Sequence, residues 1–223
     1  MSRWDGLAEA VYAHPSGAST AARLALTAKR VGYDQLVIKN ADTIPTSPPI
    51  EAIADEYDID IISGIELDGP IETVSGRLPH LRRETSVLAV RGGTDAKNRF
   101  VARQPYADIL AGPITHEGPD IGPGIATDAS EHEVAIEVDL GPLRTQGGRR
   151  VRYIDRLRRL WRVVDHYDLE YVLTASPSSH LGVVPPRELV ALADLVGIDA
   201  DAAVVGLETW VTIARRNQQQ ATD

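Results

Sequence analysis

Short runs rich in Val, Ile and Leu, which are typical of buried strands, alternate along most of the chain with stretches whose apolar residues recur at helical spacing. The runs that predict strands are residues 10–12, 35–38, 60–65, 85–90, 108–110, 134–140 and 171–174. The stretches that predict helices are residues 18–31, 50–57, 149–167, 186–196 and 200–215. Repeated strand–helix units build a parallel sheet, which can be either open or closed into a barrel.

Glycine and proline interrupt this pattern in one long segment, and polar residues end it. Residues 112–124 hold so many Gly and Pro that we expect an irregular loop there. The polar residues 216–223 are predicted to form a disordered tail. With 223 residues, of which 43% are hydrophobic, the chain can bury one full core, and residues 1–215 are predicted to form a single domain.

The sequence shows no sign of a membrane span or an export signal. No run approaches the roughly 20 uncharged apolar residues that a span needs, and residues 1–5 contain no apolar signal core. We therefore expect a soluble, cytoplasmic protein with no membrane partner. Because the chain has no cysteine, disulfides, thiolate nucleophiles and sulfur-based zinc sites are excluded.

The charge balance is strongly acidic. The chain has 32 acidic against 23 basic residues, a formal net charge of −9, and only three of the bases are lysines: Lys29, Lys39 and Lys97. This composition favours a salt-loving source organism, although a GC-rich genome also enriches arginine and alanine. Net acidity argues against a nucleic-acid partner unless the positive charge is concentrated in one region.

The positive charge is concentrated in two regions. Asp155 alone opposes the arginines of the first region, which are Arg144, Arg149, Arg150, Arg152, Arg156, Arg158, Arg159 and Arg162. The second region is diluted by Glu84 and Asp95, and its bases are Arg77, Arg82, Arg83, Arg91, Lys97, Arg99 and Arg103. Localised charge of this kind is compatible with binding a polyanion.

The arginine-rich segment has the pattern of an amphipathic helix. Its apolar residues recur at helical spacing and are expected to face the core: Ile154, Leu157, Trp161 and Val164. A row of four arginines, Arg149, Arg152, Arg156 and Arg159, follows a different face and is suited to bidentate phosphate contacts. Two alternatives remain, a solvated face on which Asp155 pairs with Arg158 or Arg159, and a docking face for an acidic protein.

The histidines do not form a metal-binding motif. There are six, and none stands in an HxH or HExxH pattern. His14, Asn40 and Glu66 nevertheless follow the first three predicted strands. In a parallel barrel such positions converge at the carboxyl ends of the strands, where functional sites lie.

These positions resemble the PHP family of metal-dependent phosphoesterases, in a degenerate form. The family has HxH after the first strand, a histidine after the second and a glutamate after the third. Here Tyr12 replaces the first histidine, Asn40 replaces the third, and residues 174–177 lack the closing Asp-x-His pair. Only His14 and Glu66 remain, too few ligands for a metal cluster. A PHP-type phosphoesterase with a degenerate site is the enzyme alternative, and a protein-binding barrel without an RNA role is a third possibility.

A second resemblance extends over nearly the whole chain. The sequence is similar to the PHP-like protein subunit of archaeal ribonuclease P, the counterpart of the eukaryotic 30-kilodalton subunit. The similarity lies in the order and spacing of Val90-Arg91-Gly92-Gly93, Asn98-Arg99, Ala107-Asp108-Ile109-Leu110, Val134-Ala135-Ile136-Glu137-Val138, Leu140-Gly141-Pro142-Leu143, Leu173-Thr174-Ala175-Ser176 and Pro186-Arg187-Glu188-Leu189. It implies a TIM-like α/β barrel.

The resemblance also implies a function. The chain would be a non-catalytic, RNA-binding helper in removal of the 5′ leader from precursor tRNA, with catalysis by the RNA subunit and its magnesium ions. No catalytic residue, metal or other cofactor is expected on this chain. The implied partners are ribonuclease P RNA, precursor tRNA indirectly, the small ferredoxin-like ribonuclease P protein and other ribonuclease P proteins.

The expected RNA contacts fall into two sets. The first set is the arginine row, Arg149, Arg152, Arg156 and Arg159. The second consists of Lys39, Arg91, Arg99, Arg103 and His180; of these, Lys39, Arg91, Arg99 and His180 are expected to gather at the carboxyl ends of the strands, outside the apolar core. The adjacent Gly92-Gly93 turn would allow close backbone approach and leave Arg91 free to reach outward.

Overall fold

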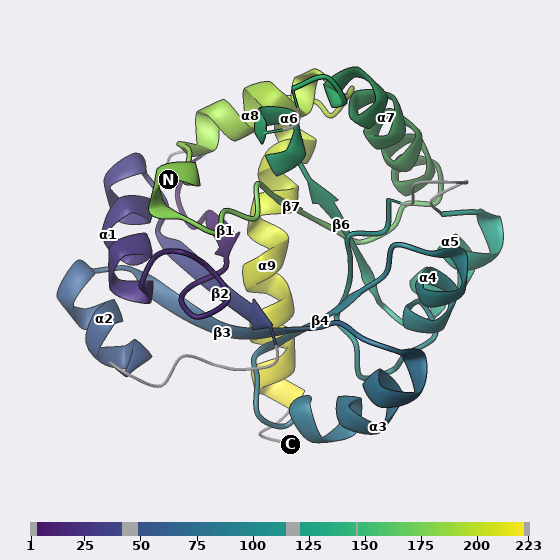
Figure 1. Cartoon of the computed structure of the whole chain (residues 1–223), viewed down its shortest axis with the longest axis horizontal. Helices are drawn as coiled ribbons and strands as arrows, with labels where there is room; N and C mark the ends of the chain where they lie inside the picture. Colours follow the sequence, from purple (N-terminus) through teal and green to yellow (C-terminus); the bar gives the residue numbers. More distant parts are fainter. Residues whose placement is uncertain (1–3, 42–48, 115–120, 146, 221–223) are drawn as a thin grey trace.

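The protein folds as a single parallel sheet that curls into a nearly closed barrel (Figure 1). The computed structural model describes residues 4–41, 49–114, 121–145 and 147–220. The seven strands follow one another in sequence order: β1 (Ala8–Val11), β2 (Gln35–Ala41), β3 (Asp60–Leu67), β4 (Val87–Arg91), β5 (Ile109–Ala111), β6 (Ala135–Asp139) and β7 (Tyr171–Thr174). Each neighbouring pair is parallel. The prediction of a TIM-like α/β fold is confirmed.

Helices follow the strands, and most of them cover the outside of the barrel (Figure 1). They are α1 (Ala21–Val31), α2 (Ile50–Tyr57), α3 (Ile71–Leu81), α4 (Asp95–Val101), α5 (Pro123–Glu131), α6 (Gly141–Thr145), α7 (Arg150–His166), α8 (Pro186–Asp194) and α9 (Ala200–Gln220), with a 3-10 turn η1 at His180–Gly182. The sequence pattern did not predict α3, α4, α5 or α6. Helix α5 begins inside the segment expected to be an irregular loop, since Pro123 occupies its first turn, where a missing backbone N–H costs nothing.

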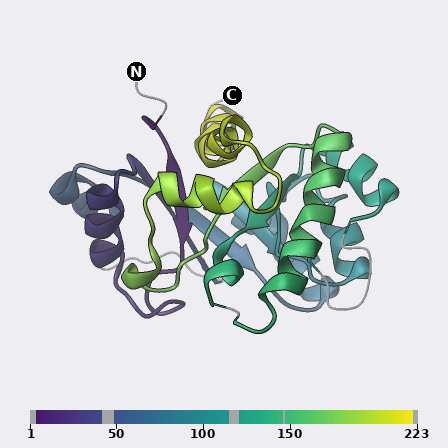
Figure 2. The same ribbon diagram turned by 90° about the horizontal axis from the view of Figure 1, so that it is seen from above.

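The core has two apolar layers, because alternate residues of each strand point to opposite faces of the sheet. The outer layer lies between the sheet and helices such as α1 and α7. The inner layer fills the concave face, where residues such as Val37, Ala89 and Ile109 contact Trp210 and Ile213 of α9. Figure 2 shows α9 end-on beside the curled sheet. A helix therefore contributes part of the barrel's interior.

The barrel is joined between β1 and β7 by side chains and by α9. Glu9 of β1 is completely buried and accepts hydrogen bonds from Thr174 Oγ1 (2.6 Å) and from the backbone N–H of Ala175 (3.1 Å). Burial raises the pKa of Glu9, although these hydrogen bonds partly oppose the rise. Trp210 Nε1 donates to the carbonyl of Leu173 at 2.9 Å. These contacts join the first and last strands.

The predicted disordered tail is wrong for residues 216–220. Helix α9 continues to Gln220, and Arg216 forms an ion pair with Glu170 at 3.2 Å. Asn217 Nδ2 donates to the Ser86 carbonyl (2.9 Å) and to Asp108 Oδ1 (3.0 Å). Arg216 and Asn217 therefore bind polar groups near the amino ends of the strands. Residues 221–223 lie outside the described part.

Candidate functional site

Charged side chains line the carboxyl ends of the strands inside the barrel. On β2, Val37 lies in the inner apolar layer and Lys39 follows it on the same face. On β4, Ala89 is followed in the same way by Arg91, and on β6, Ala135 is followed by Glu137. The inner face therefore changes from apolar to charged as the strands approach their carboxyl ends.

Lys39 lies at the centre of this charged layer. Its side chain is 1% exposed, and its Nζ pairs with Glu137 and, at 3.2 Å, with Glu66. The ammonium also lies 4.9 Å from the centroid of the Tyr12 ring, within the range of a cation–π contact. Burial alone would lower the pKa of Lys39, but the charges of Glu137 and Glu66 raise it well above its ordinary value. Lys39 is therefore a permanent buried cation.

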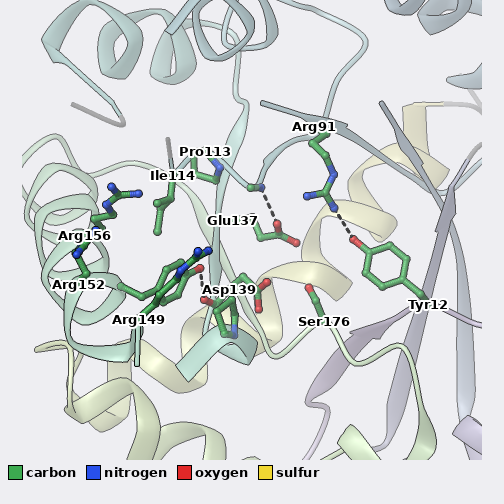
Figure 3. Close-up of a pocket in the computed structure, with 13 residues that line it drawn as sticks. Tyr12, Arg91, Pro113, Ile114, Glu137, Asp139, Arg149, Arg152, Arg156 and Ser176 are labelled. Carbon is green, nitrogen blue, oxygen red and sulfur yellow. Dashed lines mark hydrogen bonds between the residues drawn. The ribbon is translucent and has the colours of Figure 1, made fainter. Parts of the chain in front are cut away.

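Glu66 is enclosed by donors. It accepts a hydrogen bond from Tyr12 Oη at 2.5 Å, and it pairs with both Lys39 and Arg91. Burial would raise the pKa of Glu66, but the two cations hold it below the ordinary value. Arg91 also donates to Tyr12 Oη at 3.0 Å, as Figure 3 shows. The carboxylate is ionised, and its oxygens are already engaged.

The PHP-type metal cluster does not fit these residues. A metal site of the PHP type would need the Glu66 carboxylate as a ligand, but Lys39 and Arg91 already pair with it and bring positive charge to this position. Asn40 Oδ1 accepts the backbone N–H of Ala13 at 2.7 Å, and His14 is exposed. No group of three or more His, Cys, Asp or Glu residues in the described ranges is arranged to hold a metal ion. These residues therefore do not form a PHP-type metal site.

A cavity of about 610 Å³ opens at the carboxyl ends of the strands. Figure 3 shows Arg149, Arg152 and Arg156 of the α7 region on one side and Arg91 on the other. The remaining lining residues are Tyr12, Gly112, Pro113, Ile114, Glu137, Asp139, Pro142, Tyr153 and Ser176. Four arginines from two distant parts of the chain thus converge on one cavity.

Two acidic residues of β6 line this cavity and have different partners. Glu137 pairs with Lys39 and accepts the backbone N–H of Gly112 at 2.8 Å. Asp139 accepts the N–H of Gly141 at 2.8 Å, but burial and the nearby charge of Glu137 raise its pKa to about 7. At neutral pH the Asp139 carboxyl is therefore near half protonation.

The arginine row is split by the helix geometry. Arg149, Arg152 and Arg156 line the cavity, whereas Arg159 lines a smaller one of about 310 Å³ with Ile121 and His166. At roughly 100° of rotation per residue, Arg159 lies about 80° around the helix from Arg149. The apolar face agrees with the prediction, since Leu157 and Val164 are buried and Ile154 and Trp161 pack against the core. The ion pair expected if this helix face is solvated is also present, because Asp155 lies 3.9 Å from Arg158.

Of the four residues predicted to gather outside the core, Lys39 and Arg91 do meet, at Glu66, but Lys39 is buried. Lys39 is inside the barrel, because strand alternation places it on the same face as Val37, and only Arg91 of the four lines the cavity. Arg99 pairs with Asp95 at 3.4 Å. The ring Nδ1 of His180 lies 2.9 Å from Ser19 Oγ.

Arg103, the remaining residue of this second set, also lies outside the cavity lining, and it pairs with Asp128 at 2.7 Å. The Gly92-Gly93 turn does depend on close approach, since a Cβ at Gly92 would clash with Asn98 Oδ1, which accepts the Gly93 N–H at 2.9 Å.

Sequence reasoning missed several residues of the site, namely Tyr12, Glu137, Asp139 and Ser176 as lining groups. A signal existed for two of them. Glu137 and Asp139 interrupt an otherwise apolar strand at alternate positions, which places both on one face.

The sequence profile of the family described as RNase P subunit p30 matches residues 9–222. This chain belongs to the ribonuclease P subunit p30 family. Two relatives named Ribonuclease P protein component 3, from Halorubrum lacusprofundi and Haloarcula marismortui, are each 40% identical to it. The alignments cover 96% and 95% of this chain and 92% and 91% of the relatives. The family prediction is confirmed, and the acidic composition fits haloarchaeal relatives.

Two solved structures share the fold of this p30-family chain. One is a chain of an archaeal ribonuclease P structure with mature tRNA, with a TM-score of 0.80 and 20% identity, covering 97% of this chain and 93% of that one. The other is histidinol phosphate phosphatase from Lactococcus lactis, with a TM-score of 0.55 and 10% identity, covering 84% and 94%. None of the helices in the described ranges has the length and apolar character needed to cross a membrane.

Proposed function

We propose that this p30-family chain is a non-catalytic, RNA-binding subunit of cytoplasmic ribonuclease P, which supports the RNA subunit in removing the 5′ leader from precursor tRNA. The observation that carries the proposal is the convergence of Arg91, Arg149, Arg152 and Arg156 on one cavity. In a chain of net charge −9, such a concentration of arginine favours a polyanionic partner.

The barrel interior supports a binding role. A general base needs a carboxylate or imidazole available to take a proton. Glu66 is held ionised by Lys39 and Arg91, and Glu137 is paired with Lys39. These ion pairs stabilise the barrel and fix Arg91 at its rim. Phosphodiester chemistry would then belong to the RNA subunit and its magnesium ions.

The partners follow from the same assignment. The relatives are named as ribonuclease P proteins, and the chain with the same fold comes from a ribonuclease P structure with tRNA. We assign to this chain the ribonuclease P RNA as direct partner, precursor tRNA indirectly, and the small ferredoxin-like protein among the other subunits. Arg159, Arg99, Arg103 and His180 remain proposed as secondary contacts, whereas buried Lys39 is not.

The test replaces the arginine row with glutamine at four positions: Arg149, Arg152, Arg156 and Arg159. Folding is expected to be preserved, because the buried face of α7, which includes Leu157 and Val164, is unchanged. Each lost phosphate contact lowers the slope of log affinity against log salt by roughly 0.7 to 0.9. The reconstituted enzyme should also need more magnesium, because divalent ions can replace part of the lost positive charge.

A control variant separates local charge from net charge. It removes the same number of exposed arginines from other faces, namely Arg23, Arg30, Arg187 and Arg215, and should leave the salt slope unchanged. If the row variant assembles and titrates with salt like its parent, the RNA assignment of α7 is wrong. The basic stretch of residues 77–103 then becomes the better candidate.

The non-catalytic assignment has its own test. The purified chain without RNA is expected to cleave neither precursor tRNA nor simple phosphodiesters, assayed with magnesium, manganese or zinc. Chelator-sensitive hydrolysis that co-purifies with the chain, and that is lost on replacing Glu66, would support the degenerate phosphoesterase instead.

A further inference from the structure

The cavity has the dimensions of a small-ligand site rather than of a flat contact surface. Its volume of about 610 Å³ falls within the range of roughly 300–1,000 Å³ that is typical of pockets for small molecules. A helical RNA backbone passing over α7 would contact the outer ridge of the helix and would not fill this space. A single nucleotide turned out of an RNA strand is small enough to enter it.

The positive side of the cavity is suited to one phosphate group. Arg149 directly precedes α7, Arg152 and Arg156 project from its amino-terminal half, and Arg91 faces them from β4 (Figure 3). Cations near a helix amino terminus are unfavourable, because the helix dipole is positive there. The first turn of α7 has no acidic residue, and Arg149 gives it no side-chain cap. A bound anion would relieve this accumulation of positive charge.

The rest of the cavity supplies the other contacts that a nucleotide needs. Pro113, Ile114 and Pro142 offer apolar surface against which a base can pack. Asp139 and Ser176 add a carboxyl and a hydroxyl group for the polar edge of a base or for a ribose. Ser176 has a positive φ of 44°, a strained conformation that for a residue other than glycine is often retained where a side chain has a function.

We propose that this cavity binds one unpaired nucleotide of ribonuclease P RNA, with its phosphate on Arg149, Arg152 and Arg156 and its base or ribose against Asp139 and Ser176. The inference rests on the proposed RNA-binding function. The inference differs from the proposed function in geometry, because the arginines would surround the phosphate of one extruded nucleotide and would not contact a row of successive phosphates.

The first test fills the cavity without removing any charge. Ile114→Trp adds a large side chain to the wall and retains all four arginines. Losing the packing and polar contacts of one base should weaken binding of the RNA on the order of ten-fold. In the reconstituted holoenzyme, one nucleotide should regain reactivity toward a 2′-hydroxyl acylating reagent, while the other protected nucleotides remain protected.

The second test identifies the occupant directly and covers the case in which the tryptophan variant does not fold. A photoreactive benzoylphenylalanine at position 114 should crosslink to a single RNA nucleotide in the holoenzyme. The same residue at Val151, which is 73% exposed, is the matched control and should not give that crosslink.

The outcomes separate this inference from the proposed function. If Ile114→Trp binds RNA normally while the four-arginine variant does not, the chain binds RNA but the nucleotide pocket is wrong. A crosslink from position 114 to a protein subunit also overturns the pocket, because an acidic protein segment would then occupy it. If neither variant changes RNA binding, the proposed role of α7 fails as well.

Discussion

Replacing Lys39 with methionine should cost roughly 3–5 kcal/mol of unfolding free energy, the cost of removing one partner from a buried ion pair. Lys39 neutralises two carboxylates whose side chains are only 4% and 3% exposed, Glu66 and Glu137. Glu66 would keep Arg91 and Tyr12. Glu137 would keep the amide of Gly112 but would lose the one cation it pairs with in the described part of the chain, so most of the cost should fall on Glu137.

Lys97→Met is the matched control. Lys97 pairs with Asp68 at 3.0 Å, but the two side chains are 28% and 56% exposed. Exposed pairs contribute about 0–1 kcal/mol, and salt screens them. Urea denaturation followed by circular dichroism, at constant potassium chloride concentration, measures both variants. Raising the salt concentration should reduce the effect of Lys97→Met and leave that of Lys39→Met nearly unchanged.

The pH dependence gives a second measurement on the same variant. Lys39 is one of the two cations that hold the pKa of Glu66 below its ordinary value, so removing Lys39 should raise that pKa, and the Glu66 carboxyl should bind a proton in the folded state at a higher pH than in the parent. The stability difference from the parent should therefore be smaller at pH 5 than at pH 8. The buried-cation interpretation is refuted if Lys39→Met costs no more than Lys97→Met, or if acid does not narrow the difference.

Two further predictions test Asp139 and the end of α9. The pKa of Asp139 is near 3.8 in the unfolded chain and about 7 in the folded protein, so the parent loses stability as pH rises through this interval. Asp139→Asn removes that loss. In thermal denaturation the variant should be more stable than the parent at pH 8, by up to roughly 4 kcal/mol, but not at pH 3. Replacing Arg216 and Asn217 with alanine removes their contacts and should cost about 2 kcal/mol, whereas replacing the exposed Gln219 and Gln220 with alanine should cost almost nothing. Equal melting temperatures for the two variants would contradict the structure.

The strands were predictable from sequence to within about three residues at each end, because apolar β-branched runs bounded by polar residues have few other structures. The helices that were missed carry weaker signals. Helix α3 contains Gly76 and Pro79, and α5 begins within a segment rich in Gly and Pro. Helix α4 is only seven residues long, which is too short for a clear helical period.

The candidate site was only partly predictable. The arginine row could be predicted, since residues three and four apart share a helix face. The partners of Lys39 could not be predicted, because Glu66 and Glu137 lie 27 and 98 residues away and meet it only when the sheet curls. Strand alternation does place Lys39 with Val37 on the inner face, but the sequence alone does not say which face is enclosed.

The helix that joins the two sides of the barrel is synthesised after all seven strands. Trp210 of α9 fills the inner layer and bonds to β7, so the inner layer stays incomplete while residues 200–220 remain within the ribosome. During that interval β1 and β7 are sheet edges without their cover, and such edges can pair with other chains. The barrel is therefore completed only once α9 has left the ribosome, and prompt synthesis of α9 shortens the time in which nascent chains can aggregate.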